Sequence, residues 1–133
     1  MDITEPKVIF RETAFDTETT MAQCDTEGTA IYLHKEEQTE APDFLFAIAH
    51  ELRHIWQMRT NKDRYIENYL PANMCGSTDE YNQQLAEVDA NAFASIVMID
   101  WFGLSPQWDG MNGETIRMIE EKRGEILKEL MRQ

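Results

Sequence analysis

Two histidines separated by three residues, His50 and His54, place the strongest constraint on this chain, because a glutamate, Glu51, lies between them. On a helix, positions i and i+4 stand on one face about one turn apart, so both imidazoles can contact one metal ion. Imidazole is a ligand that suits Zn²⁺, and a neighbouring carboxylate can take a proton from water beside the metal. The segment therefore predicts a helix that carries a zinc site, with Glu51 as general base.

The competing interpretation is two surface histidines on an ordinary helix. The chain has 3 histidines among 133 residues. Two of them would fall in this register around a glutamate by chance in roughly one case in a hundred. We therefore favour the metal site, and note that imidazole and carboxylate ligands also accept Mn²⁺ and Fe²⁺.

Length and charge restrict the remaining classes of function. A chain of 133 residues, 42% hydrophobic, predicts one globular domain over residues 1–133. No apolar run approaches the roughly 20 residues of a membrane span, and the first residues resemble no signal peptide, so we expect a cytoplasmic protein. The net charge of −13 repels phosphates and anionic lipids, which argues against direct binding of nucleic acid or membranes. Cys24 and Cys75 are expected to be free thiols.

The order of strand and helix patterns predicts an α+β fold. The segments 7–12 and 29–34, with a looser strand up to Cys24, predict a small antiparallel or mixed sheet over about 7–34, built as a hairpin or meander. Helices are predicted over about 42–59, 78–102 and 113–131. Ser77 and Glu80 form a capping-box pattern before the second of these helices, and Asn112 can cap the third.

The first predicted helix has two different faces. At 100° per residue, Phe44, Ile48 and Ile55 fall on one side, while both histidines point away from it. Such a helix is expected to lie on the sheet with its apolar face and to line a cleft with its histidines.

A third protein ligand must come from another part of the fold, because two histidines leave the ion short of donors. Glu87 and Asp89 lie about 200° apart on the second predicted helix, so only one of them can face the ion. Glu87 shares its side with small residues and with Asn91, which could hydrogen-bond a ligand imidazole. We therefore prefer Glu87. Asp89 falls on an apolar side, where an ion pair with a basic residue such as Arg53 would explain it.

His34 is an alternative third ligand from the predicted strand 29–34. Three tyrosines, Tyr65, Tyr69 and Tyr81, could each donate a phenol hydroxyl to a developing oxyanion, although packing is the more usual role of a tyrosine.

The segment from His50 to His54, followed by the pattern E-x-x-A-N-x-F-A from Glu87 to Ala94, resembles the gluzincin metallopeptidases. It is most similar to the ImmA/IrrE-type branch, over roughly residues 28–98. Asp89 stands where that branch carries a second glutamate, and Arg53 where glycine is common.

The resemblance implies a zincin-like minimal metallopeptidase domain, to which the residue pattern adds the predicted C-terminal helix over about 113–131. It implies that His50, His54 and Glu87 bind zinc, that Glu51 acts as general base and then acid, and that Asn91 supports a ligand. The strand 29–34 would be the edge against which an extended substrate lies.

Three functions from different classes remain open. The first is a zinc-dependent metalloendopeptidase that hydrolyses peptide bonds through a metal-activated water, with a regulatory protein as a candidate substrate. The second is a catalytically silent, zinc-stabilised protein-binding module of regulatory or mobile-element origin. The third is a metal-free helical interaction domain. A protein or peptide is the expected partner, and the sequence does not predict the oligomeric state.

Overall fold

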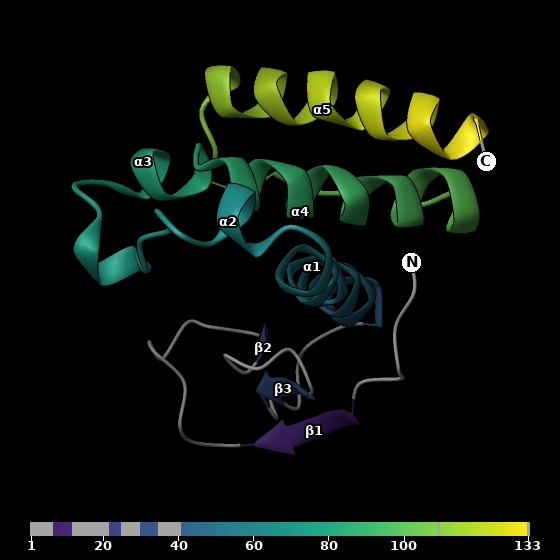
Figure 1. The fold of residues 1–133 in the computed structure, drawn as a ribbon. Coiled ribbons are helices and arrows are strands. Elements are labelled where there is room, and N and C mark those ends of the chain that lie inside the picture. Colours follow the sequence, from purple (N-terminus) through teal and green to yellow (C-terminus); the bar gives the residue numbers. More distant parts are fainter. Residues whose placement is uncertain (1–6, 12–21, 25–29, 35–40, 109, 133) are drawn as a thin grey trace.

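The computed structural model describes residues 7–11, 22–24, 30–34, 41–108 and 110–132. Most of these residues lie in helices (Figure 1), and no helix among them is both long and apolar enough to span a membrane. The strands are β1 (Lys7–Arg11), β2 (Ala22–Cys24) and β3 (Ala30–His34). The helices are α1 (Ala41–Thr60), α2 (Lys62–Tyr65), the 3-10 helix η1 (Ala72–Met74), α3 (Thr78–Asn82), α4 (Leu85–Ile96), the π-helix η2 (Val97–Trp101) and α5 (Gly113–Met131).

The elements are stacked in layers with α4 at the centre. Figure 1 shows α5 lying along α4, α1 on the other side of α4, and the strands beyond α1. Every residue of α4 after Leu85 is buried. A helix that is covered on all sides must be apolar or small around its whole circumference, and the alanines at positions 86, 90, 92 and 94 meet this requirement.

The predicted α+β fold class is wrong, because the protein is mainly helical. The larger buried cluster lies between helices and includes Ala49 of α1, Phe93 of α4 and Ile119 of α5. The strands have only five, three and five residues. Among the residues whose side chains the structure describes, the cluster that faces the strands has two buried members, Ile31 and Ile55. Helix-on-helix packing therefore forms the core, and the strands cover one side of α1.

The predicted hairpin is present between β2 and β3, but β1 does not extend it into an antiparallel meander. The sheet has the order β1-β3-β2, with β1 parallel and β2 antiparallel to β3. Because β3 is paired on both sides, it cannot be the edge that receives an extended substrate, and that prediction is wrong. Local residue patterns indicate which segments are extended, whereas the choice of neighbouring strand depends on contacts between distant segments.

The helix α1 uses its apolar face as the sequence predicts. Phe44, Ile48 and Leu52 pack with Ile55 against Ile31 of β3. The opposite side of α1 contacts α4. The helix is thus held between the sheet and α4, which fixes the direction of its polar face.

The second predicted helix, over 78–102, is broken into α3, α4 and η2. Ser77 caps α3 by accepting a hydrogen bond from the Glu80 backbone N–H at 3.0 Å. The break falls at Gln84, whose backbone is extended. Its side chain accepts a hydrogen bond from Leu70 N and donates one to Leu70 O, at 2.8 and 2.9 Å. These contacts with a distant segment replace the hydrogen bonds of a continuous helix.

Removing the Ile55 side chain should show how much the contact between α1 and β3 contributes to stability. Because Ile55 is fully buried, Ile55→Ala is expected to lower the free energy of unfolding by about 2–5 kcal/mol in urea. Ile99→Ala, at a residue that is 40% exposed, should cost less than about 1 kcal/mol. Equal losses in the two variants would contradict this account of the core.

Candidate metal centre

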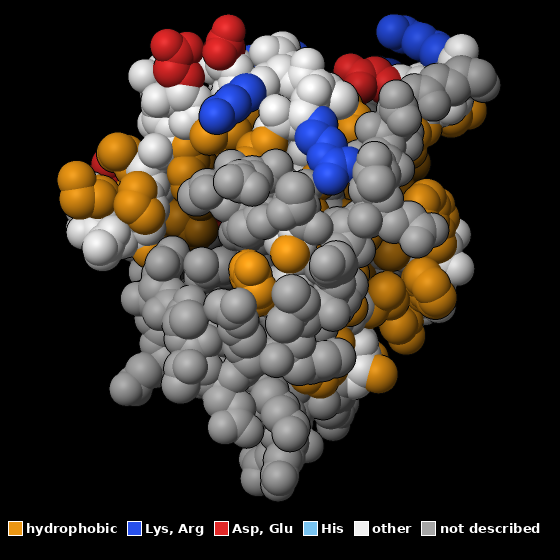
Figure 2. All heavy atoms as spheres, turned by 60° about the horizontal axis from the view of Figure 1, so that its bottom comes forward, with side chains coloured by type: hydrophobic (Ala, Val, Ile, Leu, Met, Phe, Trp, Pro, Cys, Tyr) orange, Lys and Arg blue, Asp and Glu red, His pale blue; other side chains and the backbone are white. Residues whose placement is uncertain are grey.

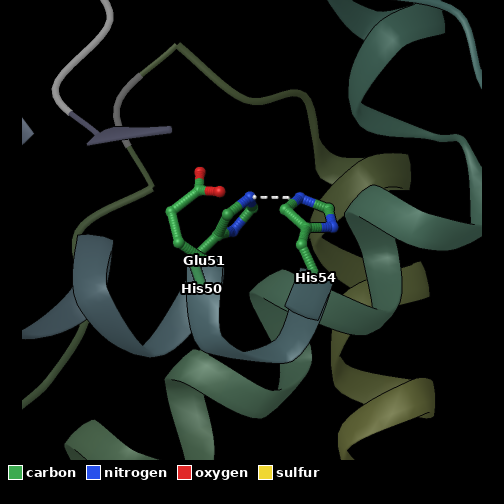
Figure 3. A group of neighbouring side chains, drawn as sticks. All are labelled: His50, Glu51 and His54. Atoms are coloured by element: carbon green, nitrogen blue, oxygen red, sulfur yellow. Dashed lines mark hydrogen bonds between the residues drawn. The ribbon is translucent and has the colours of Figure 1, made fainter. Parts of the chain in front are cut away.

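The two histidines face one another across one turn of α1. Figure 3 shows their imidazoles side by side, with the Glu51 carboxylate next to the His50 ring. The two Nε2 atoms are 3.0 Å apart. His50, Glu51 and His54 each offer a ligand atom, and these atoms lie within 4.8 Å of one another. The i, i+4 spacing thus brings both imidazoles to one point on the helix surface.

Glu87 reaches this point from α4. Its carboxylate oxygens lie 2.7 Å from His54 Nε2 and 3.3 Å from His50 Nε2. The residue is only 2% exposed. The alanines of α4 allow this approach, because small side chains let two helices pack closely. Glu87, and not Asp89, therefore faces the imidazoles.

The donor set fits a zinc ion. Zinc bonds of about 2.0–2.1 Å at tetrahedral angles separate neighbouring ligand atoms by about 3.3 Å. The two Nε2 atoms are 3.0 Å apart. The nearest Glu87 carboxylate oxygens lie 2.7 Å from His54 Nε2 and 3.3 Å from His50 Nε2. Small movements of the side chains would therefore open the group to the spacing of three zinc ligands, and both nitrogens and carboxylates are ligand types that zinc accepts.

Each imidazole is held by an amide oxygen at its other nitrogen. Asn91 Oδ1 lies 2.8 Å from His50 Nδ1, the contact expected for Asn91 from the sequence. Gln57 Oε1 lies 2.9 Å from His54 Nδ1. An amide oxygen only accepts, so both Nδ1 atoms must carry the hydrogen. Both Nε2 atoms are then directed to the centre of the group, the arrangement that metal-binding imidazoles require.

Gln57 was missed by the sequence analysis. A signal was present, because Gln57 follows His54 by three residues and therefore lies beside it on the helix. However, polar residues at such spacing are common on exposed faces. Only the structure shows that Gln57 is fully buried.

Asp89 forms the ion pair that the sequence suggested. Arg53 Nε and Nη2 donate to its two carboxylate oxygens at 2.8 and 3.2 Å. The guanidinium group also lies over the Trp56 ring, 3.6 Å from its centroid. Asp89 is fully buried, so its charge depends on these partners.

Glu51 and Glu87 border the imidazole pair in different surroundings. Glu51 and His50 line a cleft of about 540 Å³, together with Phe46, Tyr81, Met98 and Leu104. Glu51 is itself buried, at 8% exposed, but it borders this cleft, whereas Glu87, at 2% exposed, is enclosed between α1 and α4. A ligand needs a fixed position, and a general base needs access to water and substrate. These surroundings favour Glu87 as the ligand and Glu51 as the base.

Part of the cleft lining is apolar, and exposed apolar residues that do not line the cleft precede this part in the chain. Leu104 lies in the cleft wall and is 38% exposed. The preceding residues Trp101 and Phe102 are 64% and 58% exposed. Figure 2 shows hydrophobic side chains gathered on the right of the molecule, the side on which α4 ends in Figure 1. The cleft therefore combines polar groups near His50 with an apolar margin.

Two of the three candidate tyrosines lie at the site. Tyr69 donates a hydrogen bond to Glu87 Oε2 at 3.0 Å, and its hydroxyl is 2.8 Å from that of Tyr81. Tyr81 lines the cleft. Burial and then the negative charge of Glu87 raise the pKa of both tyrosines, so both phenols keep their protons at neutral pH. Tyr65 instead packs against Trp56, away from the cleft.

The electrostatics of the group reflect the close pair of His54 and Glu87. Burial by itself lowers the pKa of His54, but the charge of Glu87 and their hydrogen bond outweigh it and raise the pKa to about 9. Burial would raise the pKa of Glu87, yet the two histidines lower it well below its usual range. Without a metal the pair is therefore an ion pair at neutral pH, and zinc must displace a proton from His54.

The side chains of His34 and Cys24 lie outside the described residues, so the alternative of His34 as a ligand is not addressed. Cys75 is a free thiol.

No family model, no curated protein and no solved structure matches this chain. Its site is therefore interpreted from its own geometry.

The metal-free protein should become less stable as the pH rises. The raised pKa of His54 contributes stability that is complete below pH 6.5 and is lost as the pH approaches about 9. In the presence of EDTA, we expect the free energy of unfolding, measured by urea denaturation, to fall by about 3 kcal/mol between pH 6.5 and about pH 9. Glu87→Gln removes the charged partner and should abolish most of this dependence. An unchanged pH dependence in that variant would contradict the assignment of the pair.

Proposed function

We propose that this protein is a zinc-dependent metalloendopeptidase. The observation that carries the proposal is the convergence of His50 Nε2, His54 Nε2 and the Glu87 carboxylate, within 3.3 Å of one another, beside Glu51 in an open cleft. The amide contacts at both Nδ1 atoms support it, because they direct the Nε2 atoms to one point. The resemblance to ImmA/IrrE-type gluzincins belongs to the same proposal.

Each residue has a distinct part in the proposed reaction. His50, His54 and Glu87 would hold zinc, which supplies Lewis acidity and makes a water molecule acidic near neutral pH. Glu51 accepts the proton of the attacking water and passes it to the nitrogen of the leaving amine.

Tyr81 is the proposed donor to the carbonyl oxygen of the scissile bond, where negative charge develops. It lines the cleft, and its hydroxyl is held 2.8 Å from that of Tyr69. Tyr69 in turn is bonded to Glu87, so the tyrosine pair is fixed relative to the ligands. Because Tyr69 donates its proton to Glu87, Tyr81 donates to the Tyr69 oxygen in the free site, and its hydroxyl hydrogen would turn to the carbonyl oxygen when substrate binds.

The proposed substrate is a peptide or an extended segment of a regulatory protein in the cytoplasm. The apolar cleft wall, with Phe46, Met98 and Leu104, suits a hydrophobic side chain of the substrate. The net charge of −13 favours the approach of neutral or basic substrates over acidic ones.

Replacing Glu51 with glutamine tests the proposal. The wild-type protein should contain about one zinc ion per chain by elemental analysis and should cleave members of a library of neutral and basic quenched fluorescent peptides. Glu51→Gln should retain zinc and lose at least about 100-fold of the activity, because the amide cannot accept the proton. Glu129→Gln, at an exposed position on α5, is the matched control and should keep full activity.

Two results would contradict the proposal. Wild-type protein that takes up no added zinc would exclude the metal centre. Zinc-loaded protein that cleaves no member of this peptide library would instead favour the catalytically silent binding module.

Removing the Tyr81 hydroxyl should affect turnover and leave metal binding intact. Tyr81→Phe is expected to lower kcat about 100-fold with little change in KM or zinc content, because the lost hydrogen bond forms in the transition state. Tyr65→Phe, which lies away from the cleft, is the control. An increase in KM with an unchanged kcat would show that Tyr81 binds substrate without stabilising the oxyanion.

A further inference from the structure

A buried polar network lies behind His54, on the side of its ring away from Glu87. Gln57 Oε1 is 2.9 Å from His54 Nδ1, and Gln57 Nε2 donates to Asp89 Oδ2 at 2.8 Å. Gln57 Nε2 also donates to the backbone oxygen of Ala86 at 3.0 Å. Gln57 and Asp89 are both fully buried. The network therefore connects α4 to a candidate ligand on α1 without access to water.

The orientation of the Gln57 amide follows from these contacts. Its nitrogen faces two atoms that only accept hydrogen bonds, Asp89 Oδ2 and Ala86 O. A flipped amide would place its oxygen against both acceptors, which is electrostatically unfavourable in a buried site. The amide oxygen must therefore face His54, and His54 Nδ1 must carry a hydrogen. That requirement leaves His54 Nε2 as the atom available to a metal.

Asp89 is itself held in one position. Arg53 donates to both of its oxygens, and the Arg53 guanidinium lies over Trp56. The carboxylate oxygen that accepts from Gln57 thus has a fixed place and a negative charge. An ionised acceptor binds an amide N–H more strongly than a neutral one. The two candidate ligands are accordingly held in different ways, because Asn91 reaches His50 directly.

We propose that Asp89 is a positioning residue of the metal centre, which acts through Gln57 to keep His54 in the tautomer that presents Nε2 to the ion. The inference rests on the proposed zinc site. Asp89 touches neither the imidazole nor the metal position, and its partner Arg53 serves to hold it.

Zinc affinity tests this inference without reference to catalysis. Competition with a chromophoric chelator at pH 7.5 gives the Kd of each variant. Gln57→Met, which leaves the Arg53–Asp89 pair intact, should raise the zinc Kd about 10- to 100-fold. Asp89→Asn should raise it by a similar factor. Because Asp89 acts through Gln57, the combined variant should bind zinc no more weakly than Gln57→Met alone.

Asp89→Asn leaves Arg53 buried beside a neutral partner, which can prevent folding. The double variant Arg53→Met and Asp89→Leu removes both charges together. Where Asp89→Asn does not fold, this double variant takes its place in the comparison with Gln57→Met, with the same expected loss of zinc affinity. Gln83→Met removes a comparable hydrogen bond, from Gln83 to Thr115, outside the network. This control should leave the zinc Kd unchanged. The absorption spectrum of the Co²⁺-loaded variants provides a second readout, because a displaced imidazole alters the ligand geometry.

The outcomes separate the inference from the proposed function. Wild-type protein that binds zinc, together with an unchanged Kd in Gln57→Met, overturns the inference alone. Losses from Gln57→Met and Asp89→Asn that multiply in the combined variant also overturn it, because Asp89 would then act by another route. Wild-type protein that binds no zinc overturns both proposals.

Discussion

The burial of the Glu87 carboxylate between α1 and α4 is the constraint on which the rest of the site depends. A carboxylate that is 2% exposed is strongly destabilising unless it has charged or hydrogen-bonding partners. Here His50, His54 and Tyr69 surround it. The two histidine contacts require α1 and α4 to pack closely, which the alanines of α4 permit, while Tyr69 reaches Glu87 from the segment between α2 and η1. The fold and the candidate metal centre are therefore consequences of one helix–helix contact.

The same pair of helices holds a second buried charge, on another side of α4. Asp89 and Arg53 form an ion pair that is linked to the metal centre only through Gln57. Two residues at this spacing leave a helix about 200° apart, so the two acids reach different residues of α1: Glu87 contacts the histidines, and Asp89 contacts Arg53 and Gln57. This separation allows one acid to serve as a candidate ligand while the other is neutralised by an arginine. It also explains why a helix of mostly small, apolar residues carries two carboxylates.

Elements that depend on local patterns were predictable. The sequence predicts helices over about 42–59 and 113–131, and the structure has them at Ala41–Thr60 and Gly113–Met131. Capping residues such as Asn112, and the apolar face of α1, follow from periodicity alone. The break before α4 was not predictable, because it depends on hydrogen bonds between Gln84 and the backbone of Leu70, 14 residues away. The fold class was wrong for a related reason, since strand patterns do not reveal that helices form most of the core.

The sequence by itself determined the chemistry of the candidate site: two imidazoles one turn apart, a glutamate between them, and two further acids on a later helix. Helical periodicity fixes such relations within one element. Only the tertiary structure decided that Glu87 faces the imidazoles, that Gln57 and Tyr69 complete the group, and that β3 is an interior strand. These features depend on how separate elements pack, and packing is set by contacts between residues that are far apart in the chain.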